Sequence, residues 1–528
     1  MAARRRAGAN QLQSEAADLR SEATSLRTTT GQVLGSFDGG DSDIATADLS
    51  VALLSILMSK SSSDLIEGDL SGWIKGAPAG ARLPSTRALV AQYGVSPVTV
   101  QQALRALISK GLIETRPGVG TFVRTIRTAK PRDYGWQTAA LGTPQAQAEP
   151  SSAIFKAAPN DAIALHVGYP DRELLPERLV RTTIGRCARS ESAVTHAPSA
   201  GLPELQTWFA DELAASTAPG IQTPTAADVV ILPGSQSGLT TAFRALAGEG
   251  RTLLIESPTY RGAIIAAQQA GVRLVPVPTG PGGPDPELVE QMLKQSGARA
   301  FYAQPRFANP TGDSWTPKVA EQVLEIVRAN GVFLIEDDWS RDFGIDTNPT
   351  PIAARDDSGH VIYIRSLTKS VSPAVRVAAI IARGPARDRI LNDASGHTMY
   401  VSSILQTIAH GVVTAPAWRT HLRGLGQQLA ARRDLLINAV RDYLPQVDLP
   451  TIPHGGLNLW IRLPDQTDLI RLVQDCERQG VLINAGNEWF PAEPTGHYLR
   501  LNYSGPNPGA FPDAVKTIAA MLRLNAAQ

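Results

Sequence analysis

Cysteine is scarce in this chain, with only Cys187 and Cys476 among its 528 residues. Two cysteines supply neither a disulfide framework nor a metal-ligand cluster, so no metal site is expected. Their scarcity suits a reducing compartment, and we expect the protein in the cytoplasm. Long hydrophobic runs are also missing: no apolar stretch approaches the roughly 20 residues that span a membrane. The run Leu53–Met58 is too short for a signal peptide and lacks a cleavage pattern, so no membrane association is expected.

Aromatic residues are few, at 5%, but the hydrophobic fraction of 43% and the charged fraction of 19% are typical of a globular protein. A chain of 528 residues is too long for one ordinary domain, so two or three domains are expected. The formal net charge is only +1, yet residues 60–130 hold ten Lys and Arg against four Asp and Glu. A segment with a net charge of +6 indicates either a polyanionic partner or a solvated basic face.

The first part of the chain changes composition in steps. Residues 1–45 have almost no large apolar side chains and are predicted to be disordered, apart from a frayed helix over 11–26. A short additional helix is predicted at 47–58. Residues 62–124 are predicted to form a compact module. The segment 125–160 carries several prolines among Ala, Gln and Ser, which predicts an extended linker.

Residues 161–528 are predicted to form a second, larger domain. Apolar runs alternate with helical stretches up to about residue 384, which predicts an α/β domain with a largely parallel sheet. The last part, 385–528, mixes long helices with strand-like runs at 456–462 and 498–503. It is predicted to be a small C-terminal α+β subdomain.

A helix-turn-helix pattern lies within the compact module. Ser85 is placed to cap a helix that Gly94 ends. Ser96 is predicted to cap the next helix, with Pro97 at its first position, where a missing N–H costs little. Residues 112–123 are predicted to follow as a hairpin wing with glycines at its bend. The apolar residues of the second helix fall at helical spacing and are predicted to face the core: Val100, Leu104, Leu107 and Ile108.

The second helix keeps a polar face outside that apolar stripe. Two short helices, a tight turn and a polar face on the second helix are typical of a module that reads DNA in the major groove. A plain helical bundle with a hairpin is the alternative, and the local positive charge favours DNA binding over it. The predicted DNA-binding residues are Arg87, Ser96, Thr99, Gln101, Gln102, Arg105 and, on the wing, Arg116.

The stretch Leu70–Val123 resembles the winged helix-turn-helix of the GntR family. The matching positions are Gly80-Ala-Arg-Leu-Pro-Ser-Thr-Arg87, Val95-Ser96 and Gly118-Val-Gly-Thr-Phe-Val123. One position departs, since Pro97 stands where the family usually has an arginine after the serine that opens the recognition helix. The resemblance implies binding to double-stranded operator DNA.

Four apolar runs of the α/β region end in polar residues, and sheets of this kind bind ligands at the carboxyl ends of their strands. Tyr260 follows the first run and offers an aromatic face for a pyridine ring. Asn309 follows the second run and can donate to a phenolate oxygen, while Asp337 ends the third and can keep a ring nitrogen protonated. Lys369 follows the fourth run and can form a Schiff base with an aldehyde.

The same region offers groups that bind phosphate. Backbone N–H groups of Gly234, Ser235 and Gln236 precede a helical stretch and are predicted to face an anion, with Ser366 and Arg376 as further donors. Taken singly, each feature has a plainer explanation, such as a turn, a helix cap or a surface lysine. Their conjunction at four strand ends favours a pyridoxal 5′-phosphate (PLP) site.

Residues 160–528 resemble fold-type I aminotransferases of the class I/II group. The resemblance implies the roles just given and adds Arg500, in Tyr498-Leu-Arg-Leu501, as the residue that grips the α-carboxylate of an amino-acid ligand. Two positions depart from the family pattern. Trp339 stands where the family generally has a tyrosine near the O3′ oxygen, and His196 where a tyrosine usually reaches the neighbouring subunit's phosphate.

A GntR-like winged helix joined by a linker to an aminotransferase-like domain is the architecture of the MocR subfamily of bacterial transcription regulators, which residues 62–528 resemble. Gly168-Tyr-Pro-Asp171, after the linker, matches the subfamily's pattern as well. The resemblance implies a head-to-tail homodimer whose effector domains sense PLP, or PLP plus an amine or amino acid, and reposition the DNA-binding modules.

Two other functions stay open from the sequence. One is a catalytically active PLP-dependent aminotransferase with an accessory DNA-binding domain, and the other is a PLP store. A transaminase has no chemical use for a basic winged helix, which favours the regulator, with or without residual aminotransferase activity.

Overall fold

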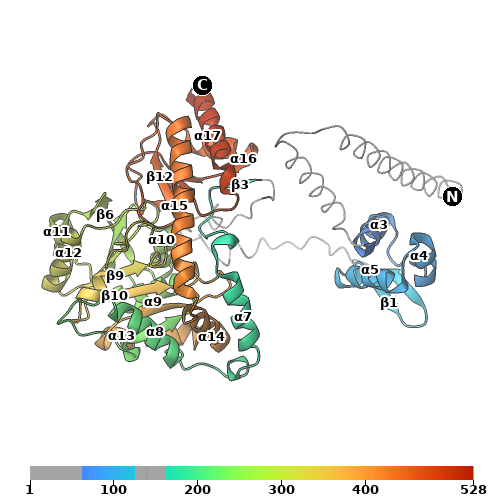
Figure 1. Cartoon of the computed structure of the whole chain (residues 1–528), viewed down its shortest axis with the longest axis horizontal. Coiled ribbons are helices and arrows are strands. Elements are labelled where there is room, and N and C mark those ends of the chain that lie inside the picture. Colours follow the sequence, from blue (N-terminus) through green and yellow to red (C-terminus); the bar gives the residue numbers. More distant parts are fainter. Residues whose placement is uncertain (1–61, 125–136, 138–139, 141–158, 160–161, 527–528) are drawn as a thin grey trace, which may run out of the picture. The chain divides into compact units, whose positions relative to one another are not determined.

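The computed structural model describes residues 62–124, 137, 140, 159 and 162–526, and the chain divides into two compact units, Met1–Pro144 and Gln145–Gln528 (Figure 1). The predictions for residues 1–45, for helices at 11–26 and 47–58, and for most of the 125–160 linker lie outside the described residues. None of the described helices is long and apolar enough to cross a membrane.

Three helices and a hairpin make up residues 62–124, the continuous described part of the N-terminal unit. They are α3 (Ser62–Gly76), α4 (Thr86–Tyr93), α5 (Pro97–Ser109), β1 (Ile113–Arg116) and β2 (Gly120–Val123). The two strands pair antiparallel, and the arrangement is the predicted winged helix-turn-helix. Sequence reasoning did not single out α3.

The signal for α3 was present in the sequence. Ile66, Leu70 and Ile74 recur every fourth residue, and all three are buried in the core of the unit. This spacing places them on one face of a helix. The helix therefore supplies the third side of the core that α4 and α5 share.

The predicted caps of α4 and α5 are present. The Ser85 hydroxyl accepts a hydrogen bond from the Ala88 N–H, and the Ser96 hydroxyl accepts one from the Thr99 N–H, both at 3.2 Å. Gly94 has a φ of 64°, the left-handed conformation that ends α4 without the steric cost of a Cβ.

One core prediction for α5 is wrong. Val100, Leu104 and Leu107 are buried, but Ile108 is 43% exposed, and Ala103 takes the fourth core position. At 100° per residue, position 108 lies about 90° from the centre of the buried stripe, at its edge. The polar face of α5 therefore has an apolar residue beside it.

An eight-stranded sheet forms the centre of the C-terminal unit, in the order β4-β11-β10-β9-β8-β5-β6-β7. The pairs from β10 to β6 are parallel, whereas β11 is antiparallel to both its neighbours and β7 is antiparallel to β6. The predicted largely parallel sheet is confirmed. Its strands are β4 (Val229–Leu232), β5 (Thr252–Ser257), β6 (Arg273–Gly280), β7 (Gly283–Pro284), β8 (Ala300–Ala303), β9 (Phe333–Asp338), β10 (Val361–Ser366) and β11 (Ala378–Ile381).

Helices cover both faces of this sheet, because its central strands are apolar on both sides. One face packs against α9 (Ser235–Ala242), α10 (Arg261–Gln269) and α13 (Gly384–Thr398). The other face packs against the remaining helices of the layer: α8 (Pro203–Ala214), α11 (Pro286–Ser296), α12 (Pro317–Asn330) and α14 (Ser403–Val413).

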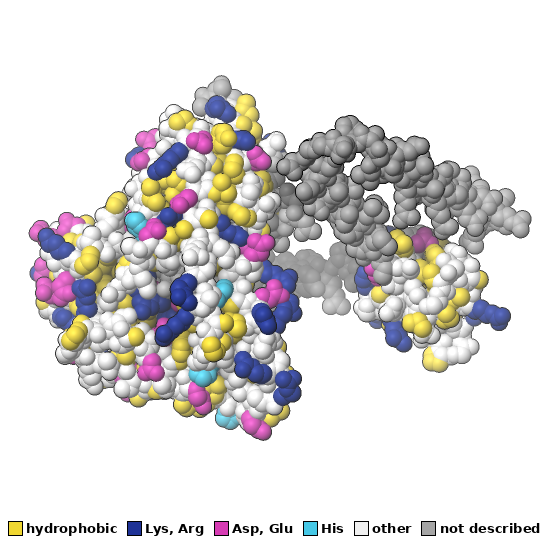
Figure 2. Space-filling model, in the orientation of Figure 1, with side chains coloured by type: hydrophobic (Ala, Val, Ile, Leu, Met, Phe, Trp, Pro, Cys, Tyr) yellow, Lys and Arg dark blue, Asp and Glu magenta, His cyan; other side chains and the backbone are white. Residues whose placement is uncertain are grey.

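Helix α7 (Glu177–Cys187) packs against α14 and presents a basic outer face. Figure 2 shows Lys and Arg side chains over it, and Arg178, Arg181 and Arg186 are exposed. Arg181 is paired with Glu177 at 2.6 Å, so part of this charge is neutralised within the helix.

A smaller subdomain is built around a three-stranded antiparallel sheet of β12 (Asn458–Arg462), β15 (Tyr498–Asn502) and β14 (Asn484–Ala485). The two strands predicted for the C-terminal region are the first two of these. A separate pair joins β13 (Val481–Leu482) to β3 (Ile163–Ala164). The helices of this subdomain are α15 (Trp418–Tyr443), α16 (Leu469–Arg478) and α17 (Phe511–Ala526).

The packing differs from the expected subdomain border at residue 385. Helices α13 and α14 contribute to the cores of the large sheet, because their apolar faces bury against β4, β10 and β11. Strand β3, from the beginning of the unit, pairs instead within the small subdomain. The chain therefore crosses between the two subdomains at both ends of the unit.

The contrast between neighbouring residues of α5 gives a matched test of the N-terminal core. Leu107→Ala should lower the free energy of unfolding of this unit by about 2–5 kcal/mol, because it removes a buried side chain and leaves a cavity. Ile108→Ala should change it by at most about 0.5 kcal/mol, as for a surface position. Pulse proteolysis of the full chain across a urea series, following cleavage within residues 62–124, measures both. Equal losses for the two variants would contradict this assignment of the core.

Candidate functional site

A cavity of about 360 Å³ lies where the central strands of the large sheet end. This volume falls within the range of small-molecule sites in proteins. Nine side chains predicted from the sequence line it together, although they come from segments far apart in the chain: Ser235, Gln236, Tyr260, Asn309, Asp337, Ser366, Lys369, Arg376 and Arg500.

Asp337 enters the cavity because side chains alternate along β9, so its neighbours Glu336 and Asp338 face away from it. Its Oδ2 accepts hydrogen bonds from Tyr302 Oη and Gln304 Nε2, both at 2.8 Å. Within the described residues, its Oδ1 has no hydrogen-bond partner. Burial raises the pKa of Asp337 to about 6, against the opposing effect of its hydrogen bonds. A buried carboxylate oxygen of this kind is suited to a ligand N–H.

Gln304 was missed by sequence reasoning, although it directly follows β8. Its amide nitrogen donates to Asp337, and its Oε1 accepts from the Asn309 N–H at 2.9 Å. Its own backbone N–H donates to Glu256 Oε2 at 2.7 Å. Gln304 therefore fixes the relative positions of Asp337 and Asn309, two residues that the sequence predicts to bind the ligand. The only signal in the sequence was a polar residue at the end of an apolar strand.

Lys369 faces the cavity from the loop after β10. Its Nζ lies 4.1 Å from the centroid of the Trp339 ring, a cation–π distance. Burial, followed by the nearby charge of Arg500, lowers the pKa of Lys369 to about 7, and Asp337 partly opposes this effect. An amine with this pKa is about half unprotonated at neutral pH, and the unprotonated form is the nucleophile.

The phosphate-binding prediction needs one correction, at Gly234. Its N–H donates to the Leu232 carbonyl at 2.8 Å instead of facing the cavity. Gly234 has a φ of 93°, and a Cβ there would lie 2.8 Å from Arg376 Nη2. Its contribution is the space that lets the Arg376 guanidinium approach, while Ser235 and Gln236 begin α9 and present first-turn N–H groups.

Tyr169 is a second residue that sequence reasoning did not assign to the site. Its hydroxyl accepts from Arg376 Nη1 at 3.3 Å, and it lines the cavity. The Tyr260 hydroxyl donates to Gln236 Oε1, also at 3.3 Å. Each phenol therefore contacts a residue predicted to bind the phosphate, Arg376 or Gln236.

Arg500 lies on β15 and is almost completely buried. Its Nη2 donates to the His166 and Val167 carbonyls at 2.7 and 3.2 Å, and its guanidinium stacks on the Trp489 ring at 4.7 Å. Burial lowers the pKa of Arg500 to about 10, which still leaves it cationic at neutral pH. A fixed guanidinium is well suited to bidentate binding of a carboxylate.

The two positions that depart from the family pattern lie in different places. Trp339 lines the cavity beside Lys369. His196 is exposed and pairs its ring with Tyr400 at 5.3 Å between centroids. His196 does not line the cavity of its own chain.

The predicted DNA-reading residues are mostly exposed on the N-terminal unit: Arg87, Gln101, Gln102, Arg105 and Arg116. The Ser96 hydroxyl caps α5 and lies 2.9 Å from the Thr99 hydroxyl, so these two groups are already engaged with each other. Arg116 donates to Glu114 and lies 4.8 Å from the Phe122 ring centroid. The wing arginine is therefore held by its own hairpin.

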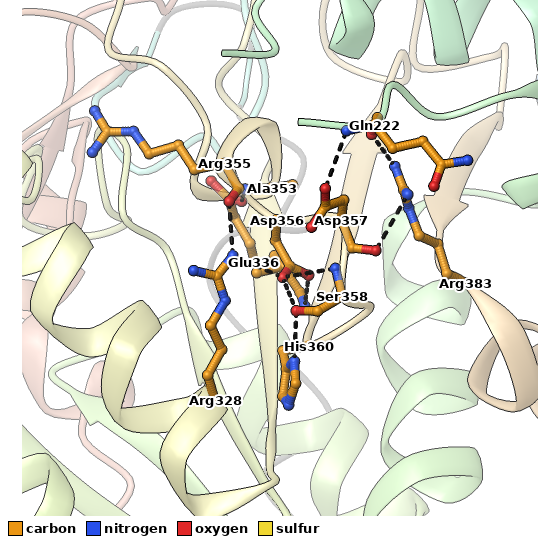
Figure 3. Close-up of polar contacts among 11 residues, drawn as sticks. Gln222, Arg328, Glu336, Ala353, Arg355, Asp356, Asp357, Ser358, His360 and Arg383 are labelled. Atoms are coloured by element: carbon orange, nitrogen blue, oxygen red, sulfur yellow. Dashed lines mark hydrogen bonds and ion pairs between the residues drawn. The ribbon is translucent and has the colours of Figure 1, made fainter. Parts of the chain in front are cut away.

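Another polar cluster has the composition of a hydrolase site but not its order. Ser358 Oγ donates to Asp356 Oδ1 at 2.6 Å and lies 2.9 Å from His360 Nδ1 (Figure 3). In a hydrolytic triad the histidine lies between the nucleophile and the carboxylate, whereas here the serine does. Asp356 also accepts from the Val361 N–H and Arg328. These hydrogen bonds stabilise the loop between β9 and β10.

The fold and the cavity together define a helix-turn-helix protein with an aminotransferase-like unit. Residues 163–518 match the family of class I and II aminotransferases, and residues 66–123 match the gntR family of bacterial regulatory proteins. The chain belongs to the class I and II aminotransferase family, and its N-terminal unit is a GntR-type helix-turn-helix domain. The fold of this family implies dependence on PLP.

Several known proteins are similar to the chain. An uncharacterized HTH-type transcriptional regulator of Bacillus subtilis, YdfD, is 30% identical over 433 residues, covering 81% of this chain and 89% of that protein. The probable rhizopine catabolism regulatory protein MocR of Rhizobium meliloti is 26% identical over 460 residues, covering 85% and 90%. Both relatives therefore match across the helix-turn-helix and the aminotransferase-like unit.

The fold of the aminotransferase-like unit is also that of a solved enzyme. The crystal structure of LysN, an α-aminoadipate aminotransferase of Thermus thermophilus complexed with N-(5′-phosphopyridoxyl)-L-leucine, gives a TM-score of 0.64 at 24% identity. The matched region covers 70% of this chain and 94% of the LysN chain. This structure matches a smaller share of the chain than the two regulators do, 70% against 81% and 85%.

The lowered pKa of Lys369 predicts an unusual labelling profile. In the cofactor-free protein, acylation of Lys369 by a small anhydride should rise with a midpoint near its pKa of about 7. The exposed Lys516, whose pKa the Asp513 carboxylate raises, should react only at much higher pH. Competitive labelling across a pH series, quantified by peptide mass spectrometry, gives both curves from one sample. Superimposed curves would mean that the cavity does not perturb Lys369.

Proposed function

We propose that this protein is a PLP-binding, DNA-binding transcriptional regulator that senses PLP, or PLP plus an amine or amino acid, through its aminotransferase-like unit. One observation carries the proposal. A single cavity holds an amine of lowered pKa, a carboxylate with an open acceptor and three arginines, in a chain that also carries a GntR-type helix-turn-helix.

The residues of the cavity fit each group of PLP. Lys369 would form the covalent link, Asp337 Oδ1 would hold the proton on the ring nitrogen, and Asn309 would contact the phenolic oxygen. Tyr260 would cover the ring face. Bound there, PLP supplies an electron sink. The residues that would hold its phosphate are Ser235, Gln236, Ser366 and Arg376.

Trp339 supports sensing over efficient turnover. The family generally has a tyrosine at this position, near the O3′ oxygen, and an indole offers no oxygen there to accept or donate a proton. In this chain the Trp339 ring contacts Lys369 Nζ. An active aminotransferase with an accessory DNA-binding domain is the second candidate, favoured by the intact set of Asn309, Asp337, Lys369 and Arg376.

A homodimer belongs to the same proposal. Large apolar side chains are exposed along one region where α7 and α14 pack together. Val194 is 82% exposed and Met399 71%, which is costly for an uncovered surface. The other exposed apolar residues of this region are Ile184, Tyr400 and Ile404. A second copy of the chain would cover them, and His196 lies among them.

The central experiment separates the regulator from the enzyme. Borohydride reduction of the PLP-loaded full chain should attach the cofactor to Lys369 alone, and Lys369→Ala should abolish the attachment. A regulator should then shift a fragment of its own promoter in a manner that depends on PLP or an amino acid. Amino-acid turnover with 2-oxoglutarate and no ligand-dependent change in DNA binding would favour the enzyme. A label on a different lysine would overturn the site.

A variant of Arg500 distinguishes between PLP alone and an amino acid as the effector. Losing a charge-assisted contact to a carboxylate should weaken amino-acid binding by roughly ten- to several-hundred-fold. Arg500→Ala should therefore keep the cofactor's absorbance and the DNA affinity, yet lose the spectral change that an amino acid causes. If regulation by PLP alone persists in this variant, the vitamin is the signal. Loss of PLP itself would contradict the role of Arg500.

The DNA-reading face predicts two kinds of variant. Gln102→Ala should relax sequence preference, at roughly 1–3 kcal/mol for the base pair that it reads. Arg116→Ala should weaken binding to every sequence and lower the salt dependence by about one counterion. Glu114→Gln is the matched control, since it frees Arg116 from its carboxylate and should strengthen binding to every sequence. Fluorescence anisotropy with operator variants at several salt concentrations distinguishes the two classes. A uniform loss from both alanine variants would refute this division.

A further inference from the structure

Arg261 is a cavity residue to which the proposed function assigns no role. It begins α10 directly after Tyr260 and lines the same cavity. Its side chain is only 9% exposed and forms an ion pair with Glu488 at 3.3 Å. Among the described residues that line the cavity, the other cations are Lys369, Arg376 and Arg500, and the proposed function has a use for each of them.

The two members of this ion pair differ in how firmly they are placed. Arg261 is buried at the start of a helix and cannot turn to solvent without leaving the protein interior. Glu488 is 32% exposed and lies on the short 3₁₀ segment Gly486–Trp489 of the small subdomain. A carboxylate with this exposure is readily hydrated when it leaves its partner, whereas a buried guanidinium needs a replacement anion.

Glu488 is electrostatically close to the second arginine as well. Burial lowers the pKa of Arg500, and Glu488 is among the charges that raise it in opposition. The next residue, Trp489, stacks on Arg500 and accepts a hydrogen bond from the Thr259 N–H at 2.8 Å. One protein carboxylate therefore pairs with Arg261 and also acts electrostatically on Arg500.

We propose that Arg261 binds the distal carboxylate of an α-amino dicarboxylic acid, which takes the place of Glu488. The inference rests on the proposed function, in which Arg500 binds the α-carboxylate of an effector. The exchange conserves charge at Arg261, because one carboxylate replaces another, and Glu488 moves into water.

The fixed charge decides the class of effector. A ligand with a cationic end would have to pair with Glu488 and would meet the buried Arg261 and Arg500 on the way. A ligand with an uncharged end would leave the ion pair in place and gain no charge-assisted contact. Only an anionic end gains such a contact from a cation that is already buried and desolvated.

The exchange also lets effector binding change a contact between the large sheet's helix layer and the small subdomain. Arg261 belongs to the layer of helices on the large sheet, and Glu488 belongs to the segment before β15. Replacing Glu488 by a ligand removes one of the contacts between the two subdomains beside Arg500. A dicarboxylic effector therefore breaks the Arg261–Glu488 ion pair, whereas a monocarboxylic effector leaves it intact. The two kinds of effector also differ in how tightly they bind.

The test is a spectral titration of the PLP-loaded full chain with matched ligands. L-Aspartate, L-glutamate and L-2-aminoadipate place a carboxylate at three lengths, and L-asparagine and L-glutamine are uncharged counterparts of the first two. L-Lysine supplies a cationic end. The best dicarboxylic ligand should bind roughly ten- to a hundredfold more tightly than its uncharged counterpart.

Two variants locate the preference. Arg261→Gln should reduce the dicarboxylic ligand to the affinity of its uncharged counterpart, with the cofactor's absorbance as the control for folding. Glu488→Gln removes the competing carboxylate and should tighten the dicarboxylic ligand several-fold without tightening the uncharged one. Glu493→Gln, at an exposed position of the same subdomain, is the matched control and should change neither.

The outcomes separate this inference from the proposed function. Equal binding of charged and uncharged ligands, or a preference that survives Arg261→Gln, would overturn the inference alone. Tightest binding of L-lysine, lost in Glu488→Gln, would show that the cationic end is recognised instead. If no amino acid changes the spectrum although PLP is bound, the amino-acid response itself fails, and this inference fails with it.

Discussion

The burial of carboxylates at the end of β9 is the constraint on which the site depends. Glu336, Asp337 and Asp338 follow one another and are all buried, although isolated buried charges are strongly unfavourable. Each carboxylate is stabilised separately. Glu336 accepts from the Ile352 and Ala353 N–H groups, and Asp338 accepts from Tyr363 at 2.6 Å. Because strand alternation sends these two away from the cavity, Asp337 faces the ligand site without a like charge beside it on that face.

The hydrogen bonds of Asp337 explain why the site is prepared for a ligand. Tyr302 and Gln304 both bind the same oxygen, so the other oxygen keeps its acceptor capacity. Gln304 also fixes the backbone of Asn309. A single amide therefore holds in one rigid frame the proposed acceptor for a ring nitrogen and the side chain proposed to contact a phenolic oxygen, which lowers the cost of ordering them on binding.

The charges of the cavity are more consistent with a receptor for anionic ligands than with a general pocket. Arg376, Arg500 and Arg261 line it from a loop, a strand and a helix, and each is positioned by protein groups: the Tyr169 hydroxyl, two backbone carbonyls and Glu488 respectively. Cations held in this way need little rearrangement to bind phosphate or carboxylate. The helix-turn-helix unit has its own core and caps, so its fold does not depend on this cavity.

The sequence by itself determined the two domains, the order of motifs and most of the site, because these depend on local signals. Local sequence patterns predict the helix caps at Ser85 and Ser96. They also predict the strands that precede Tyr260, Asp337 and Lys369. Tertiary structure decided what depends on segments distant in sequence. The Gly234 N–H donates to a backbone carbonyl, Ile108 lies at the edge of the core, and α13 packs against the large sheet. Gln304 and the Arg261–Glu488 pair acquire their roles only when the chain folds, because their partners lie on other elements and no local pattern records a contact across the fold.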